Sequence, residues 1–473
     1  MNDEQTKNPL LNGGILKSLV KLSVPIILAN ILATAYQITD AFWVGRLGKD
    51  AVAAVSLSWP IMFLVVALGG GLAMAGTILA GQYKGQADHK MIDFISGQTI
   101  TMVATVAVIL SALAYFITPF LVSLMHAESN VYWQAVSYLR ISFIGMIAIF
   151  GTATFQSLMR GVGDVKTPVY IIFGTVCLNF LLDPLFMFGW KFIPALGVSG
   201  VAIATVMTEA LAAIIGFSLL FSGKYGIHLK LKNLKPDWAS FKRIFKIGFP
   251  SSIEQSMRAI GMAAMTLLVA HFGTIVLAAY GVGGRMFSFV IIPAMGLSIA
   301  TSTMVAQNIG AGQIERAQKI AKTSAYLGFW SLSLVGVLMF LVARPLSVFF
   351  IPGENEVIHL STLFIQMIAM SFGFMAVAQI LTGTLRGAGD TMSAMILAIV
   401  SFWVFQFPLA FILSKFTPLA ELGIWLAFPV ANVLSFIVTW WWFNQGKWKH
   451  KKITSQNEQV LKTTEETMIE EAI

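Results

Sequence analysis

Hydrophobic residues in this chain fall into long, nearly continuous stretches that short polar segments separate. Each stretch is about 20 to 30 residues long, and a helix of about 20 residues crosses the hydrocarbon core of a bilayer. The pattern therefore predicts an all-α membrane protein with twelve transmembrane helices. Their expected bounds are 16–45, 51–80, 92–119, 131–157, 166–189, 198–222, 241–271, 276–306, 317–348, 356–384, 391–415 and 421–445.

One pattern of residues occurs twice along the chain. Gly85 recurs 225 positions later as Gly310, and the run at 160–164 recurs as 386–390. Further pairs at the 225-residue offset are Gly71 and Gly296, Gln82 and Gln307, and Pro25 and Pro250. Because each copy holds six helices, both copies keep the same orientation in the membrane, which is a parallel repeat.

The repeat predicts the domain organisation. We expect an N-terminal six-helix lobe at 1–222, a cytoplasmic connecting loop at 223–240 and a C-terminal six-helix lobe at 241–445. A polar cytoplasmic tail follows at 446–473, and its composition predicts disorder after Trp448. Two such lobes favour alternating access by rocking of one lobe against the other.

The distribution of charge predicts the orientation. The segments on the side of the two termini hold 23 of the 31 Lys and Arg residues, and the loops on the other side hold five. Cytoplasmic loops carry such an excess, so both termini are expected in the cytoplasm. The net charge of +9 is explained in the same way. Only 11% of the residues are charged, and no soluble domain is predicted that would bind nucleic acid.

Acidic residues inside the predicted helices are candidates for function, because a charge in the bilayer is costly. Asp40 and Asp183 lie at a similar depth, about 10 Å below the outer surface at 1.5 Å per residue. Asn179 is one turn from Asp183, and Thr205 of another helix lies at nearly the same level. Several oxygens with an anionic member suit a hard cation such as Na⁺. The same two carboxylates could hold a proton, and a purely structural hydrogen-bond cluster is the third interpretation.

The repeat provides an internal comparison for these four residues. Their counterparts in the second copy are Met265, Trp403, Phe407 and Ala431. Pro184 still matches Pro408, so the helix pattern remains while the oxygen ligands are absent. Since the second copy does without the acids, they are expected to serve function rather than folding, and the ion site is expected in the first lobe only.

Several short segments resemble one family of transporters. They are QITDAFWVGRLG after the proline of the first helix, the loops LMRGVGD and TLRGAGD, NFLLDPLFMFG in the fifth helix and LGVSGVAIAT at the sixth. Together these segments resemble the multidrug and toxic-compound extrusion (MATE) family, and the resemblance covers about 14–445. The resemblance implies a two-lobed, twelve-helix fold, a bacterial inner-membrane location and efflux of drugs. It also implies that Asp40, Asn179, Asp183 and Thr205 form the cation site of the N-terminal lobe.

Other intramembrane residues have a less specific interpretation. Glu254 is a possible site in the second lobe or an ion pair with Arg258, one turn away. Glu209 is a group beside the ion site or a packing contact. Tyr36 and Tyr138 could line a drug cavity, and core packing explains them equally well.

The expected function is ion-coupled efflux. We expect an antiporter that exports apolar, often cationic compounds, such as drugs or toxins, in exchange for Na⁺ or H⁺. The sequence contains no phosphate loop, no hydrolase elbow and no Cys or His cluster, so it predicts a transporter rather than an enzyme. We also expect a monomer that has no cofactor. A lipid-linked saccharide flippase of the same fold is the alternative, and a channel or receptor is less favoured.

Overall fold

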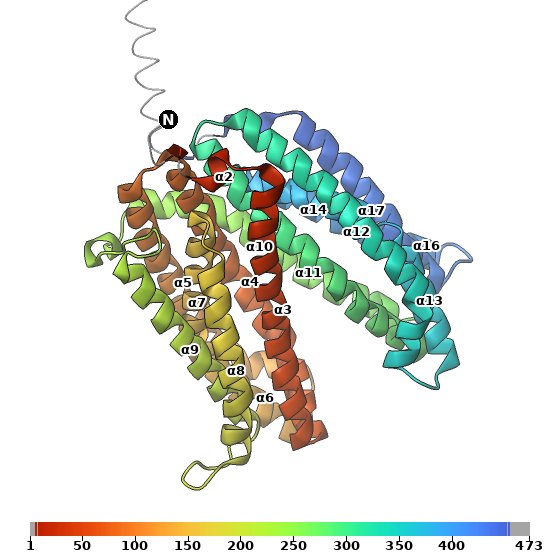
Figure 1. The fold of residues 1–473 in the computed structure, drawn as a ribbon. Helices are drawn as coiled ribbons and strands as arrows, with labels where there is room; N and C mark the ends of the chain where they lie inside the picture. Colours follow the sequence, from red (N-terminus) through yellow and green to blue (C-terminus); the bar gives the residue numbers. More distant parts are fainter. Residues whose placement is uncertain (1–4, 7, 452, 455–473) are drawn as a thin grey trace, which may run out of the picture. The chain divides into compact units, whose positions relative to one another are not determined.

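The fold is built from helices, most of them long (Figure 1). The computed structural model describes residues 5–6, 8–451 and 453–454. Its helices are α2 (Pro9–Asn12), α3 (Ile15–Val44), η1 (Gly45–Leu47), α4 (Lys49–Gln86), α5 (His89–Ser123), α6 (Ser129–Ile144), α7 (Met146–Val162), α8 (Lys166–Phe188), α9 (Val198–Ser222), η2 (Leu231–Leu234), α10 (Trp238–Ala270), α11 (Thr274–Gly310), α12 (Ile314–Phe350), α13 (Asn355–Ala369), α14 (Phe372–Gly387), α15 (Thr391–Ile399), η3 (Val400–Gln406), α16 (Phe407–Lys415), α17 (Glu421–Asn444) and η4 (Lys447–His450).

The apolar stretches become helices close to their expected bounds. Within the described residues, nine helices are long and apolar enough to cross a membrane, and up to eleven spans result if two bent helix pairs each count as one. The predicted number of twelve is therefore not confirmed. The helix expected at 241–271 is present as α10, but Glu254, Gln255 and Arg258 lower its mean hydropathy.

Two helices that the sequence predicted as single elements are broken. The span expected at 131–157 consists of α6 and α7, which meet at Gly145 with a bend of 49°. The span expected at 356–384 consists of α13 and α14, with a bend of 55°. A Cβ at Gly145 would overlap the side chain of Val206 on α9, so the glycine lets a neighbouring helix fill the break. The two breaks occupy corresponding places in the two copies of the repeat.

The span expected at 391–415 also differs from a regular helix. Its middle, η3, is a π-helix between α15 and α16. The corresponding span of the first copy, α8, is a continuous α-helix of 23 residues. Local π-helices often occur at functional positions, and here η3 includes Trp403, the counterpart of Asn179.

The chain forms two compact units. Unit 2 contains Val24–Ala80 and His89–Ala259, and unit 1 contains the described parts of Met1–Ser23, Gly81–Asp88 and Ile260–Ile473. The segment that leads into each six-helix copy therefore packs in the unit formed mainly by the other copy. The lobe bounds expected from the repeat describe sequence copies and stay a prediction.

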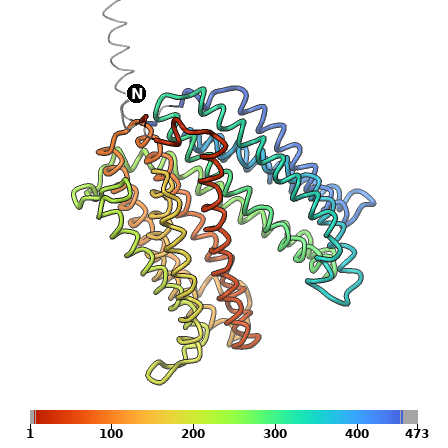
Figure 2. The backbone as a smooth tube through the Cα atoms, viewed as in Figure 1, coloured from red at the N-terminus to blue at the C-terminus, as the bar shows by residue number. Residues whose placement is uncertain are grey.

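Each unit is a bundle of helices in which neighbours along the chain pack together. In unit 2, α9 contacts α6, α7 and α8, and α5 contacts α6 and α7. In unit 1, α11, α12 and α14 contact one another, and α17 contacts α14 and α16. Figure 2 lets the reader follow α8 into α9 in unit 2 and the run from α11 to α14 in unit 1.

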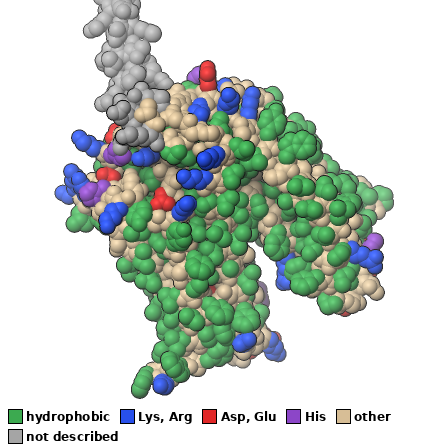
Figure 3. Space-filling model, in the orientation of Figure 1, with side chains coloured by type: hydrophobic (Ala, Val, Ile, Leu, Met, Phe, Trp, Pro, Cys, Tyr) green, Lys and Arg blue, Asp and Glu red, His purple; other side chains and the backbone are tan. Residues whose placement is uncertain are grey.

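The surface of the helices is largely apolar. Figure 3 shows hydrophobic side chains along the length of the helices and Lys and Arg side chains near the helix ends. Exposed residues include Phe116 (76%), Leu267 (74%) and Leu341 (69%), which are large apolar groups. A lipid environment accounts for such exposure, because contact with water would be unfavourable.

The start of the tail is ordered, which corrects the prediction of disorder after Trp448. The Trp448 ring is 1% exposed and stacks on Phe443. Lys451 Nζ lies 3.2 Å from Asp390 Oδ1, and the hydroxyl of Thr454 accepts a hydrogen bond from the Gln86 side chain. These contacts to the bundle fix a segment that its polar composition alone would leave unfolded. The rest of the tail, 455–473, lies outside the described residues.

Candidate ion-coupling site

Three helices of unit 2 carry the four predicted ion ligands. Asp40 is on α3, Asn179 and Asp183 are on α8, and Thr205 is on α9. The Asn179 and Asp183 side chains are fully buried, whereas Asp40 and Thr205 are partly exposed. The structure therefore places the four residues in one unit and on helices that the sequence predicted.

Hydrogen bonds join the four residues in two pairs. Asn179 Nδ2 donates to Asp183 Oδ1 over 3.1 Å, as expected for side chains one helical turn apart. The Thr205 hydroxyl donates to Asp40 Oδ2 over 3.4 Å and links α9 to α3. The carboxyl groups of Asp40 and Asp183 lie within electrostatic range of each other, so the two pairs form one cluster.

The cluster has acceptor oxygens without donors. Asp40 Oδ1, Asn179 Oδ1 and Asp183 Oδ2 are buried and have no hydrogen-bond partner among the described residues. Buried oxygens of this kind are costly unless a donor or a cation compensates them. No three His, Cys, Asp or Glu side chains gather as metal ligands in the described chain. Two carboxylates with neutral oxygens can accept a monovalent cation or a proton.

A glycine on α9 allows this helix to pack closely against α8 near the four predicted ligands. A Cβ at Gly200, in the first turn of α9, would lie 2.5 Å from the carbonyl carbon of Phe186 on α8. A real Cβ does not reach so close to backbone atoms, so the contact requires glycine. The close crossing brings the α9 residue Thr205 to the same site as the α8 residue Asp183.

An apolar cluster lies one helical turn away from Asp40, Asp183 and Thr205. Val44 follows Asp40 by four residues, Met187 follows Asp183 by four, and Val201 precedes Thr205 by four. These three residues pack together with Ala51 and Val198, and all five are at most 4% exposed. Residues four apart share a helix face, so the cluster caps the oxygen ligands. Sequence analysis missed this cap, although the spacing of four was its signal.

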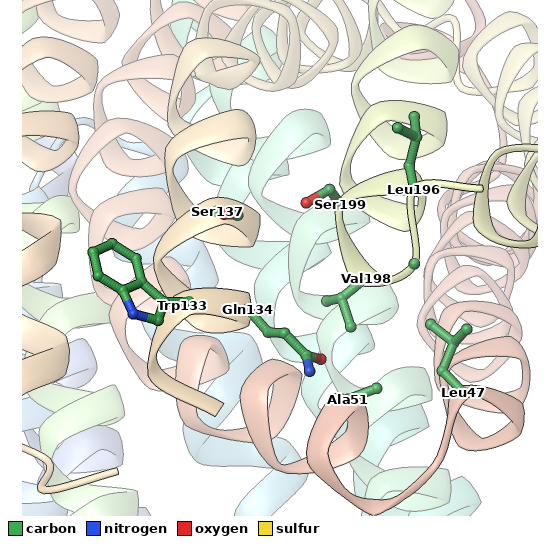
Figure 4. Close-up of a pocket in the computed structure, with 9 residues that line it drawn as sticks. Leu47, Ala51, Trp133, Gln134, Ser137, Leu196, Val198 and Ser199 are labelled. Carbon is green, nitrogen blue, oxygen red and sulfur yellow. The ribbon is translucent and has the colours of Figure 1, made fainter. Parts of the chain in front are cut away.

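A small cavity adjoins this cap. It has a volume of about 370 Å³. Its lining includes Ala51 and Val198 of the apolar cluster, and Leu47, which packs against that cluster. Figure 4 shows Gln134 and Trp133 from α6 on one side and Val198 and Ser199 from α9 on the other. The polar groups that line it are neutral side chains, which are compatible with water next to the apolar cap.

Two tyrosines flank the carboxylates. The Tyr36 hydroxyl, one turn from Asp40 on α3, hydrogen-bonds the hydroxyl of Thr208 on α9. Tyr138 on α6 packs against the apolar cap and lies within electrostatic range of Asp40 and Asp183. Both tyrosines therefore lie beside the carboxylate cluster. Thr208 was not predicted, since only the fold pairs it with Tyr36.

The second copy of the repeat has apolar packing at the corresponding positions. Met265 is 1% exposed within an apolar cluster that also contains Phe364 and Trp425. Phe407 packs against the same cluster, and Ala431 is 2% exposed. In the second copy, apolar side chains thus pack at the positions where the first copy has oxygen-bearing side chains.

Comparison with known proteins identifies the family. The MatE family model matches residues 25–185 and 250–412, which is more than half of the chain. The chain belongs to the MatE family. The two matched segments begin at Pro25 and Pro250, the same pair that the 225-residue offset links, so the internal repeat is confirmed. As a MATE protein the chain is a multi-pass membrane transporter and not an enzyme.

Individual relatives support the same assignment. The chain is 29% identical over 442 residues to the probable multidrug resistance protein YoeA of Bacillus subtilis, covering 93% of this chain and 95% of that protein. It is 27% identical to the probable multidrug resistance protein NorM of Thermotoga maritima, again over 93% and 95%. A MOP superfamily transporter from Pyrococcus furiosus has the same fold, with a TM-score of 0.87 and 21% identity over 95% of this chain and all of that one.

The other two acids of this MATE transporter have separate surroundings. Glu254 on α10 is 5% exposed, and its Oε1 lies 3.4 Å from Arg258 Nη2, which is the ion pair that the spacing suggested. Glu209 on α9 lies within electrostatic range of Tyr36, and Thr152 donates to its backbone carbonyl over 3.0 Å. Glu209 is therefore near Tyr36 and the carboxylate cluster, whereas Glu254 lies on a different helix and pairs with Arg258.

Proposed function

We propose that this MATE transporter is an antiporter that exports apolar, often cationic compounds in exchange for Na⁺, with H⁺ able to use the same carboxylates. The observation that carries the proposal is the cluster of Asp40, Asn179 and Asp183. It offers three buried oxygens without a hydrogen-bond partner in the described chain, two of them from carboxylates. A coupling ion that binds there would compensate these oxygens.

The neutral ligands favour Na⁺ over a proton. A proton shared by Asp40 and Asp183 would need only the two carboxylates. The buried amide oxygen of Asn179 and the hydroxyl oxygen of Thr205 add neutral oxygen ligands beside the two carboxylates. Hard cations bind through several oxygens, so these extra groups support a metal ion as the coupling species.

The cargo follows from the family and from the site. Relatives over almost the whole chain are named as probable multidrug resistance proteins. A negative site beside Tyr36 and Tyr138 would attract cationic aromatic compounds through charge and cation–π contacts. The flippase alternative is not favoured, because the two carboxylates would repel a pyrophosphate.

The transport cycle that we propose uses the apolar cap. With the termini in the cytoplasm of a bacterial cell, the cap of Val44, Met187 and Val201 lies on the outer side of the ligands. An ion from outside passes the cap and draws α3, α8 and α9 together around its charge. The kink at Pro25 gives α3 a place to bend, and this closure expels the drug outward. The protein acts as a monomer without a cofactor.

One experiment tests this function. Purified protein in liposomes should export an ethidium-like cation when an inward Na⁺ gradient is imposed and an ionophore collapses the pH gradient. The Asp40→Asn and Asp183→Asn variants should reconstitute equally but lose at least 90% or so of this efflux, about a tenfold effect or 1.4 kcal/mol. Wild-type protein that exports no compound of a broad cationic panel under either gradient would contradict the proposal.

A further inference from the structure

Two helices from the two copies of the repeat cross closely within unit 1. A Cβ at Gly85 on α4 would overlap the carbonyl oxygen of Gln307 on α11. In turn, a Cβ at Gly310 on α11 would overlap the carbonyl oxygen of Gln82 on α4. Gly85 and Gly310 are repeat partners, and so are Gln82 and Gln307. The contact is therefore reciprocal, with each glycine receiving the backbone of the other helix.

A short segment before the first long helix lies on this crossing. Asn8 caps α2 by accepting a hydrogen bond from the Leu10 amide over 3.0 Å. Its Nδ2 donates to Gln307 Oε1 on α11 over 3.1 Å, and Gln5 Nε2 donates to the Gly85 carbonyl on α4 over 3.0 Å. One segment of the chain thus hydrogen-bonds both crossing helices.

Further contacts hold α2 on unit 1. Leu11 is 1% exposed and Leu10 is 8% exposed, so α2 buries its apolar residues. The fully buried Asn308 of α11 donates to the Leu10 carbonyl over 3.1 Å. Arg316 of α12 donates to the Gly13 carbonyl at the end of α2. The segment is docked through its backbone as well as its side chains.

The second copy begins with a comparable segment that docks differently. There η2 lies on α5 in unit 2, where Gln98 Nε2 donates to the Asn233 and Lys235 carbonyls over 2.8 and 2.7 Å. Thr101 donates to the Leu234 carbonyl over 3.0 Å. These bonds join η2 to α5, a helix of the first copy. The contacts of residues 5–6 and 8–13, in contrast, bridge one helix of each copy.

We propose that the segment made of residues 5–6 and 8–13 is a latch that holds α4 and α11 together at the end of these two helices where they cross. The inference rests on the proposed alternating-access function, in which this end opens to take up the compound. Hydrogen bonds are lost once donor and acceptor separate beyond about 3.5 Å. Because the latch bonds both helices, opening must break its contacts with at least one of them. The bonds from Gln5, Asn8 and Asn308 join uncharged groups, so the latch releases without a change of protonation.

The test measures the separation of the two helices directly. Spin labels are placed at Lys84→Cys on α4 and at the exposed Glu315→Cys, in the first turn of α12 directly after the end of α11, once the exposed Cys177 has been replaced by serine. Electron–electron resonance on purified protein, without drug or gradient, then reports the distance distribution. We expect a dominant short distance, and a severalfold larger long-distance fraction in both Asn8→Ala and Asn308→Ala.

Controls separate the latch from other causes. Asn444→Ala removes an exposed amide at the end of α17 and should leave the distribution unchanged. Thermal unfolding checks that each variant is folded. An unchanged distribution in Asn8→Ala would overturn the latch, whatever Asn308→Ala does, because Asn308 also bonds the Met304 carbonyl within α11. Efflux measurements do not enter this result, so failure of the antiport function is recognised separately.

Discussion

At the level of single residues, the proposed ion site combines two acidic side chains with two neutral ones. Asp40 and Asp183 supply charge, and Asn179 and Thr205 each hydrogen-bond one of the carboxylates. Asp40 and Asp183 could be singled out from the sequence because intramembrane acids are rare and their counterparts Met265 and Phe407 are apolar, whereas Asn179 and Thr205 followed from their depth and from the family resemblance. The partner of Tyr36 could not, because Thr208 lies 172 residues away and only the packing of α3 on α9 pairs them.

The neutral ligands give a prediction that distinguishes Na⁺ from H⁺. Asn179→Ala and Thr205→Ala each remove one oxygen but keep both carboxylates. With the pH gradient collapsed, each should raise the Na⁺ concentration for half-maximal efflux about tenfold, which corresponds to about 1.4 kcal/mol of binding free energy. Thr105→Ala, an exposed threonine on α5, serves as the control. Efflux that follows only the pH gradient in the wild type would refute Na⁺ coupling.

At the level of elements, glycines decide how closely helices approach. Gly200 lets α9 meet the α8 backbone beside the ion site, and Gly145 accommodates Val206 where α6 and α7 break. Hydropathy along the chain cannot reveal such sites, because a glycine in a membrane helix has the same local character whether or not another backbone lies against it. The bend of 49° at Gly145 was therefore missed.

The α8–α9 crossing can be tested with a matched pair of substitutions. Gly200→Ala places a methyl group against the Phe186 backbone, and overpacking of this kind costs about 1–3 kcal/mol of unfolding free energy. Gly174→Ala on α8 meets no atom within 4 Å, and alanine should stabilise the helix there by about 0.5–1 kcal/mol. Chemical unfolding in detergent measures both. Equal effects of the two changes would show that the crossing tolerates a Cβ.

At the level of the whole molecule, two copies of one sequence pattern have different interiors. The first copy holds a polar cluster on α3, α8 and α9, and the second fills the matching place with Met265 and Phe407 beside an aromatic core. A parallel repeat keeps the helix arrangement while the residues diverge. The two copies are therefore expected to contribute unequally, with ion binding in one and packing in the other.

This asymmetry predicts which substitutions remove the effect of Na⁺ on stability. A ligand at 100 times its Kd stabilises the folded state by about 2.7 kcal/mol. Na⁺ should raise the unfolding midpoint of the wild type, compared with choline at the same ionic strength, and should not do so in Asp183→Asn. Met265→Ala should lower the starting stability by about 2–5 kcal/mol and keep the Na⁺ response. Loss of that response in Met265→Ala would place the ion outside the predicted cluster.

The sequence by itself determined the helical character of the long apolar stretches, the repeat and the positions of the acids within the helices. Long apolar stretches must become helices in a bilayer, because each backbone amide needs a partner within its own segment. The helix expected at 198–222 has those bounds in the structure, and the two family matches begin at Pro25 and Pro250 as the repeat required.

Only the tertiary structure decided how these elements meet. It placed the cap of Val44, Met187 and Val201 over the ligands and docked the segment before α3 on unit 1. It also broke two spans that are continuous in hydropathy. The physical reason is that hydrophobicity acts residue by residue along the chain. Close backbone contacts and side-chain pairs instead depend on segments that lie hundreds of residues apart, such as Asn8 and Gln307, and the packed bundle alone brings these together.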